Sequence, residues 1–194
     1  MENIDSLNIT KRLAYGKEKE DQVRKCLNET KVGYNLFPAN FLEDCKEKTD
    51  CWQVSGTGKQ SRCAIKARAT KNDILAAIRD PFYGENHADT KMGRDILYEY
   101  LLYITLSPDE KTIRVASGKK CHTIYNEMWT EWVSKKIEIN NLNCTKLILK
   151  SELHPTCELW LHRDRRSGKP KILGFIPPTY LVEGKEIAYY PFTE

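Results

Sequence analysis

Apolar residues recur at every second position in several short stretches of the chain, and this pattern predicts β-strands. Alternation is clearest over residues 73–80 and 98–106, and two further apolar stretches lie near residues 49–55 and 61–69. Successive side chains of a strand point to opposite faces of a sheet, so a period of two indicates a strand with one buried face. The sequence SGTGK at residues 55–59 lacks the spacing of a phosphate-binding P-loop and joins two strands, so we expect a hairpin turn there.

Two other segments have helical spacing. Residues 11–30 contain apolar positions separated by several helix-forming residues. Residues 118–137 place Ile124, Met128 and Trp132 on one face of a helix. Such a stripe is more often part of the core than a binding groove, so we expect it to be buried.

The C-terminal part of the chain predicts two strands on either side of a basic turn. Residues 163–171 (RDRRSGKPK) contain five cations and one anion. A cluster of this kind can contact phosphates, although a charged turn is often only solvated. The candidate DNA contacts in this turn are Arg163, Arg165, Arg166 and Lys169.

The order of these elements predicts the fold class. A helix is followed by about four strands, a hairpin, a second helix and a terminal hairpin, which indicates an α/β fold. We expect a mixed sheet core flanked by helices, with an additional C-terminal β element. The core should span residues 1–140, and residues 141–194 should form a β-hairpin extension packed on that core.

Composition is that of an ordinary globular chain. Hydrophobic residues make up 40% of the 194 residues and charged residues 30%, so we do not expect disorder. No apolar run approaches the ~20 residues that cross a bilayer, and the N-terminal residues are polar. We therefore expect a cytoplasmic, intracellular protein that does not contact a membrane. The net charge of +4 is too small for the overall field to identify a partner.

The cysteines indicate free thiols. Seven is an odd number, and without a secretory signal it favours reduced cysteines over a disulfide framework. His154 and Cys157 have a spacing that could serve zinc, but no second close pair accompanies them. We expect the thiols to be buried or half-buried.

Three charged residues on neighbouring predicted elements form the candidate site. Glu20 lies in the first predicted helix, Asp50 on the first strand of the hairpin and Lys66 on the second. Mg²⁺ is a hard cation that binds one or two carboxylates and retains several waters, and an adjacent lysine can orient a metal-bound water or neutralise charge on a phosphodiester. Each residue also has a simpler explanation, namely a solvated helix face or a solvent-facing strand position.

The residues around this site resemble the core of the PD-(D/E)XK nuclease superfamily, in particular its phage-type branch. The similarity extends over residues 11–117 and rests on GKEKEDQV at 16–23, DCKEKTDCW at 44–52, CAIKAR at 63–68 and GRDI at 93–96. The resemblance implies a restriction-endonuclease-like fold, in which a helix supplies a glutamate, the second strand an aspartate and the third strand a lysine.

Carried over residue by residue, the resemblance implies catalytic roles for Glu20, Asp50 and Lys66, with Glu20 and Asp50 as ligands of Mg²⁺ or Mn²⁺. Arg68 is expected to contact DNA together with the basic turn. The superfamily has an acid or a glutamine two residues before the lysine, whereas this chain has Ala64, which cannot bind a metal. The missing oxygen could be supplied by Gln60, Asp73, Asp80 or Asp95.

The sequence therefore predicts a metal-dependent nuclease that hydrolyses phosphodiester bonds of DNA, as an endonuclease or an exonuclease of phage or mobile-element origin. A phage enzyme of this kind would act inside the host cell. The alternative is a catalytically inactive PD-(D/E)XK-like module that binds DNA or a host protein, having lost its metal site through Ala64.

Replacing Arg165 and Arg166 with alanine tests the basic turn. If both residues contact phosphates, affinity for duplex DNA falls for every sequence, and the slope of log affinity against log salt becomes shallower by about 0.9 per lost contact. Binding titrations at several salt concentrations measure both quantities. An unchanged slope and affinity would assign the turn to solvent or to a protein partner.

Overall fold

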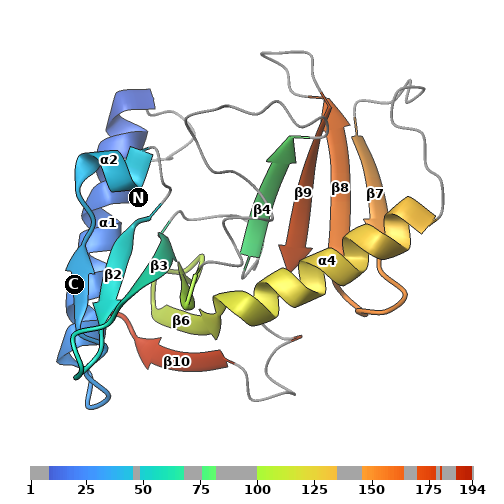
Figure 1. Ribbon diagram of the computed structural model, residues 1–194. Coiled ribbons are helices and arrows are strands. Elements are labelled where there is room, and N and C mark those ends of the chain that lie inside the picture. Colours follow the sequence, from blue (N-terminus) through green and yellow to red (C-terminus); the bar gives the residue numbers. More distant parts are fainter. Residues whose placement is uncertain are drawn as a thin grey trace.

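In this computed structural model the chain forms two β-sheets with helices packed against them (Figure 1). The structure describes residues 9–45, 49–67, 76–81, 100–134, 146–163, 170–177, 180 and 187–193. The helices in these ranges are α1 (Ile9–Glu29), α2 (Phe41–Cys45) and α4 (Gly118–Ser134). The strands are β1 (Leu36–Pro38), β2 (Cys51–Val54), β3 (Gln60–Lys66), β4 (Ala76–Pro81), β5 (Leu102–Leu106), β6 (Thr112–Ser117), β7 (Lys146–Lys150), β8 (Glu158–Arg163), β9 (Pro170–Ile176) and β10 (Ile187–Pro191).

The first sheet is mixed. Six of the described strands form it, in the order β1-β2-β3-β5-β6-β10. Strands β3 and β5 run parallel, with Ala64 opposite Tyr103, and the other neighbours are antiparallel. Together with the flanking helices, this sheet confirms the expected α/β class.

The turn between β2 and β3 is the predicted hairpin turn. The backbone amide of Ser55 donates a hydrogen bond to the carbonyl of Lys59 over 2.9 Å. Gly58 has a φ of 80°, a left-handed conformation that glycine adopts without a steric penalty. Gly58 therefore shapes the turn between the two strands.

The second sheet is antiparallel and has the order β4-β9-β8-β7 in the described part of the chain. Its β8–β9 pair is the predicted C-terminal hairpin, with His162 opposite Lys171 and Arg163 opposite Pro170. The tip of the basic turn, residues 164–169, lies outside the described residues. The two strands are thus confirmed, while the expected phosphate contacts of the turn stay a prediction.

Each sheet contains strands from both sides of residue 140. Strand β4 pairs with β9, with Ile78 opposite Gly174, and β10 returns to pair with β6, with Tyr189 opposite Arg114. The C-terminal residues therefore complete the first sheet as well as building most of the second. The division into a core and an extension at residue 140 stays a prediction.

Helix α1 covers one face of the first sheet. Val23 and Leu27 are completely buried and pack in one cluster with Leu36, Ile65 and Ile104 from the strands beneath. Complete burial of a side chain of this size contributes about 1.5–3 kcal/mol to folding. The helix predicted for residues 11–30 is thus confirmed, and its apolar side holds it against β1, β3 and β5.

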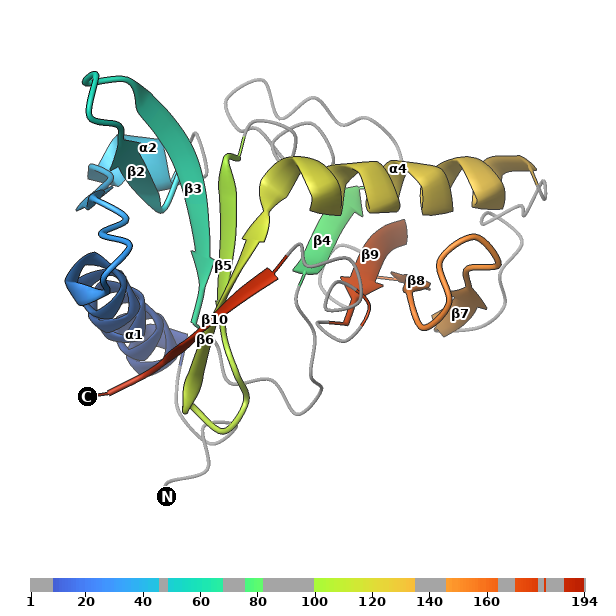
Figure 2. The same ribbon diagram turned by 90° about the horizontal axis from the view of Figure 1, so that it is seen from below.

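Helix α4 lies on the opposite side of the first sheet and also extends over the second (Figure 2). Ile124 and Met128 are buried, as the helical stripe predicts, and Tyr125 lies between them in the same cluster. That cluster includes Tyr103 of the first sheet and Leu159 of the second. The side chain of Trp132 lies outside the described residues. Among the helices that the structure describes, none is long and apolar enough to cross a bilayer.

The five cysteines whose side chains the structure describes are free thiols. Cys26 is half-buried, and the others, Cys51, Cys63, Cys121 and Cys157, are buried. His154 is engaged elsewhere: its Nε2 lies 2.7 Å from a carboxylate oxygen of Glu127, and its Nδ1 lies 2.7 Å from the hydroxyl of Tyr180. The hydrogen bond to Tyr180 and the proximity of Glu127 favour a structural role for this histidine.

Gly174 offers a test of the packing between α4 and β9. A methyl group at this position would overlap Cδ2 and Cε2 of the Tyr125 ring, so Gly174→Ala should lower the free energy of unfolding by about 1–3 kcal/mol. Urea denaturation measures this change. Gly56→Ala is the control, because nothing lies within 4 Å of the added methyl group. Equal stability of the two variants would contradict the packing described here.

Candidate active site

Asp50 is the centre of the candidate site. It lies immediately before β2, and its side chain is only 8% exposed. Its Oδ2 accepts a hydrogen bond of 2.8 Å from Nζ of Lys66 and one of 2.7 Å from the backbone amide of Ile65. A nearly buried carboxylate needs such donors, because burial without them costs several kcal/mol. The predicted opposition of Asp50 and Lys66 is therefore present in the structure.

Lys66 ends β3 and keeps its side chain 47% exposed, so its ammonium group reaches both Asp50 and solvent. Partial burial lowers its pKa, but the charge of Asp50 and the nearby phenol groups of Tyr103 and Tyr100 outweigh this effect. The net result is a pKa above the ordinary lysine value. Lys66 therefore stays charged at neutral pH, as a residue that neutralises negative charge must.

Glu20 approaches this pair from α1. Burial and the negative charge of Asp50 raise the pKa of Glu20 from 4.5 to about 7, although Lys66 and Lys17 partly offset the rise. The structure thus places Glu20 within electrostatic range of Asp50 and Lys66, and it shows a direct contact for the Asp50–Lys66 pair. The chemical roles of the three residues stay predictions.

A further acid, Asp44, belongs to the same surroundings. Its carboxylate lies 3.3 Å from Nζ of Lys17, and its charge contributes to the raised pKa of Glu20. Helix α2 holds Asp44 in place through a capping box, in which Asn40 and Glu43 exchange side-chain to backbone hydrogen bonds of 3.0 and 2.7 Å. Sequence reasoning gave Asp44 no role, because a helix of five residues carries no usable periodicity.

Ala64 occupies the position where the superfamily has an acid. It is completely buried and packs with Tyr100, Tyr103 and Cys121, so its surroundings are mainly apolar. Burial raises the pKa of Tyr100 above the ordinary tyrosine value, so the phenol stays neutral. Within this cluster, Tyr100 and Tyr103 contribute to the raised pKa of Lys66.

The proposed substitute ligands can be placed only in part. Gln60 starts β3 and is exposed, four residues before Ala64. Asp80 belongs to β4 in the second sheet, and its side chain lies outside the described residues. Asp73 and Asp95 lie outside them entirely. Of the expected DNA contacts, Arg68, Arg165, Arg166 and Lys169 are also outside the described residues, and Arg163 is described only as the last residue of β8.

Within the described ranges, no group of three or more histidine, cysteine, aspartate or glutamate side chains is arranged to hold a metal ion. Two carboxylates do suffice for Mg²⁺ when waters complete its shell. Asp50 raises the pKa of Glu20, and a cation between the two carboxylates would relieve this repulsion. Glu20 and Asp50 are therefore the carboxylates that would hold a hydrated divalent cation at this site.

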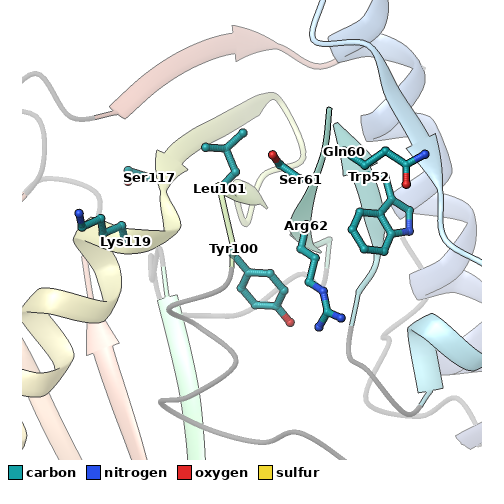
Figure 3. Close-up of a pocket in the computed structure, with 8 residues that line it drawn as sticks. All are labelled: Trp52, Gln60, Ser61, Arg62, Tyr100, Leu101, Ser117 and Lys119. Atoms are coloured by element: carbon teal, nitrogen blue, oxygen red, sulfur yellow. The ribbon is translucent and has the colours of Figure 1, made fainter. Parts of the chain in front are cut away.

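Figure 3 shows an open pocket of about 600 Å³. It adjoins the candidate site through Tyr100, which lines the pocket and contributes to the raised pKa of Lys66. It is lined by Trp52, Gln60, Ser61, Arg62, Tyr100, Leu101, Ser117 and Lys119. Sequence reasoning did not find this pocket, because its walls come from β2, β3, the residues before β5, the end of β6 and the start of α4. No protein-family model, curated protein or solved structure matches this chain. The function must therefore be argued from the residues of the site.

The raised pKa of Glu20 predicts a pH dependence of stability. The folded chain holds the Glu20 proton more tightly than the unfolded chain does, so this group makes the free energy of unfolding fall as the pH rises from about 4.5 to about 7. Glu20→Gln removes that contribution, and its stability should fall less over the same interval. Urea denaturation at both pH values measures the difference.

The control for this test is Glu18→Gln, which changes an exposed glutamate on the same helix. It should reproduce the pH dependence of the unmodified chain. If Glu20→Gln also reproduces it, Glu20 does not share the electrostatic surroundings of Asp50.

Proposed function

We propose that this protein is a metal-dependent nuclease that hydrolyses phosphodiester bonds of DNA. The observation that supports this proposal is the contact of 2.8 Å between Lys66 and a nearly buried Asp50, next to a glutamate whose pKa is about 7. The order of the elements is also the one that the PD-(D/E)XK resemblance implies. Glu20 lies on α1, Asp50 adjoins the second strand of the chain and Lys66 ends the third. On this basis we assign the mixed sheet to the restriction-endonuclease-like fold.

Each residue has a distinct part in the proposed reaction. Glu20 and Asp50 would bind Mg²⁺ or Mn²⁺, which supplies charge stabilisation at the phosphate and lowers the pKa of a bound water. The backbone amide of Ile65 holds Asp50 in one orientation. Lys66 stays charged beside the same carboxylate, so it can orient the attacking water or neutralise charge that develops on the phosphate. A cation near Glu20 would favour its deprotonated form, which is the form that binds a metal.

A second candidate function is favoured by one observation. Ala64 is completely buried beside Tyr100 and Tyr103, so the usual third oxygen is replaced by an apolar contact. A chain of this kind could retain the DNA-binding face without cleaving DNA. The protein would then be a catalytically inactive DNA-binding or host-protein-binding module.

Cleavage of supercoiled plasmid distinguishes these two functions. With Mg²⁺ or Mn²⁺ present, the unmodified chain should nick or linearise the plasmid, and EDTA should abolish the reaction. Asp50→Asn and Lys66→Met should each lower the rate by about 100-fold or more, because each removes charge from the reacting centre. Glu20→Gln should also be impaired, whereas its exposed neighbour Glu18→Gln should cleave normally.

A gel shift in EDTA completes the test. If the chain binds DNA but does not cleave it with Mg²⁺ or Mn²⁺, the nuclease proposal is wrong and the inactive DNA-binding module is favoured. If both Asp50→Asn and Lys66→Met still cleave DNA, the reaction takes place at a site other than the one that contains Asp50 and Lys66. If the chain neither binds nor cleaves DNA, a role in DNA metabolism is contradicted.

A further inference from the structure

The pocket beside the candidate site combines flat apolar surface with positive charge. Trp52, Tyr100 and Leu101 form its apolar walls, and Arg62 and Lys119 supply its cations. Figure 3 shows Lys119 toward one end and Trp52 with Arg62 toward the other, with the Tyr100 ring between them. Its volume of about 600 Å³ is within the range of pockets that hold small organic ligands. The pocket therefore suits a ligand that has both a planar apolar part and a negative group.

Trp52 and Arg62 form one end of the pocket as a unit. They are cross-strand partners in the β2–β3 hairpin, and the guanidinium carbon of Arg62 lies 5.7 Å from the centre of the Trp52 ring. Both side chains are half-buried, so each keeps part of its surface open. An aromatic ring next to an arginine offers a stacking surface for a nucleobase, and the guanidinium can also bind a phosphate.

The other end of the pocket also favours negative charge. Lys119 is exposed in the first turn of α4, where the helix dipole adds to its charge. Ser117, which also lines the pocket, caps this helix by accepting a hydrogen bond of 3.3 Å from the backbone amide of Lys120. The pocket therefore has a cation at each end, Arg62 at one and Lys119 at the other, and both can attract a phosphate.

The pocket and the candidate active site lie along the same strand. Alternation in β3 places Arg62, Ala64 and Lys66 on one face, so Arg62 lies about 13 Å from Lys66 along the strand. The charges of Lys66, Asp50 and Arg62 all influence the pKa of Tyr100, which shows that the two regions adjoin. One extended DNA strand could therefore place a base in the pocket and a phosphate near Lys66.

Paired bases cannot use such a pocket. In duplex DNA the flat faces of the bases are stacked on one another, and only unpaired or extruded nucleotides expose them to protein side chains. We propose that this pocket binds one unpaired nucleotide, with its base against Trp52 and its phosphates between Arg62 and Lys119. The proposal rests on the DNA substrate proposed above and restricts it to single strands, frayed ends or flaps.

Binding in EDTA tests this proposal apart from cleavage. Fluorescence anisotropy of a labelled single-stranded oligonucleotide should show tighter binding than the matching duplex. Arg62→Gln, Lys119→Gln and Trp52→Leu should each weaken binding of the single strand, with Trp52→Leu losing about 5-fold or more because a stacking contact is removed. Lys31→Gln changes an exposed lysine in the turn after α1 and should bind as the unmodified chain does.

Tryptophan fluorescence adds a direct readout of the pocket. The single strand should quench the emission of the unmodified chain, and Trp52→Phe should lose most of that quenching while circular dichroism shows an intact fold. Lys119→Gln alters an exposed side chain and should leave stability nearly unchanged, so weaker binding by this variant reports on the pocket.

Equal affinity of the pocket variants and the unmodified chain for the single strand would overturn the proposal. So would equal affinity for duplex and single strand, or no binding of the single strand. A deoxynucleoside monophosphate that binds as tightly as the oligonucleotide would assign the pocket to a free nucleotide and would also overturn it. If the pocket variants lose binding but no form cleaves plasmid, the pocket assignment holds and the nuclease fails. If Arg62→Gln binds and cleaves normally, the nuclease stands and the pocket assignment fails.

Discussion

The buried carboxylate of Asp50 is the constraint on which the rest of the site depends. It is neutralised by Lys66 and oriented by the backbone amide of Ile65, so one side chain ties the start of β2 to the end of β3. This contact closes the hairpin opposite its turn and fixes which side chains share a face. With Cys51 opposite Cys63, the residues on the other face include Trp52 and Arg62, next to each other at the pocket. The same pairing thus organises the candidate active site and its neighbouring pocket.

Local patterns predicted the elements that form this centre. The two-residue period of β5 and the helical stripes of α1 and α4 depend on burial of one face, which the sequence records directly. The glycine-containing turn at residues 55–59 was also predictable, because turn residues have strong conformational preferences. By contrast, the sequences of β10 and β4 do not indicate that these strands pair with β6 and β9. Those pairings join residues far apart in the chain, and they depend on the packing of the whole molecule.

The site was predictable to the same extent. Asp50 and Lys66 could be placed opposite each other from the hairpin alone, and Glu20 followed from its place in the resemblance. Ala64 is buried by Tyr103 of β5 and by Tyr100, which lies just before that strand. The sequence of β3 alone therefore could not predict this burial. The pocket was missed for the same reason, since its lining residues converge from four separate parts of the chain.

The pairing of β10 with β6 has a consequence for how the chain is made. During synthesis, β6 emerges from the ribosome about 70 residues before β10, and until then one edge of the first sheet has no neighbouring strand from this pairing. An open edge of this kind can pair with another chain. The sheet that carries Asp50 and Lys66 is therefore completed late, and a nascent or truncated chain without residues 187–191 is exposed to aggregation. The first sheet reaches its final form only after β10 has been synthesised and has paired with β6.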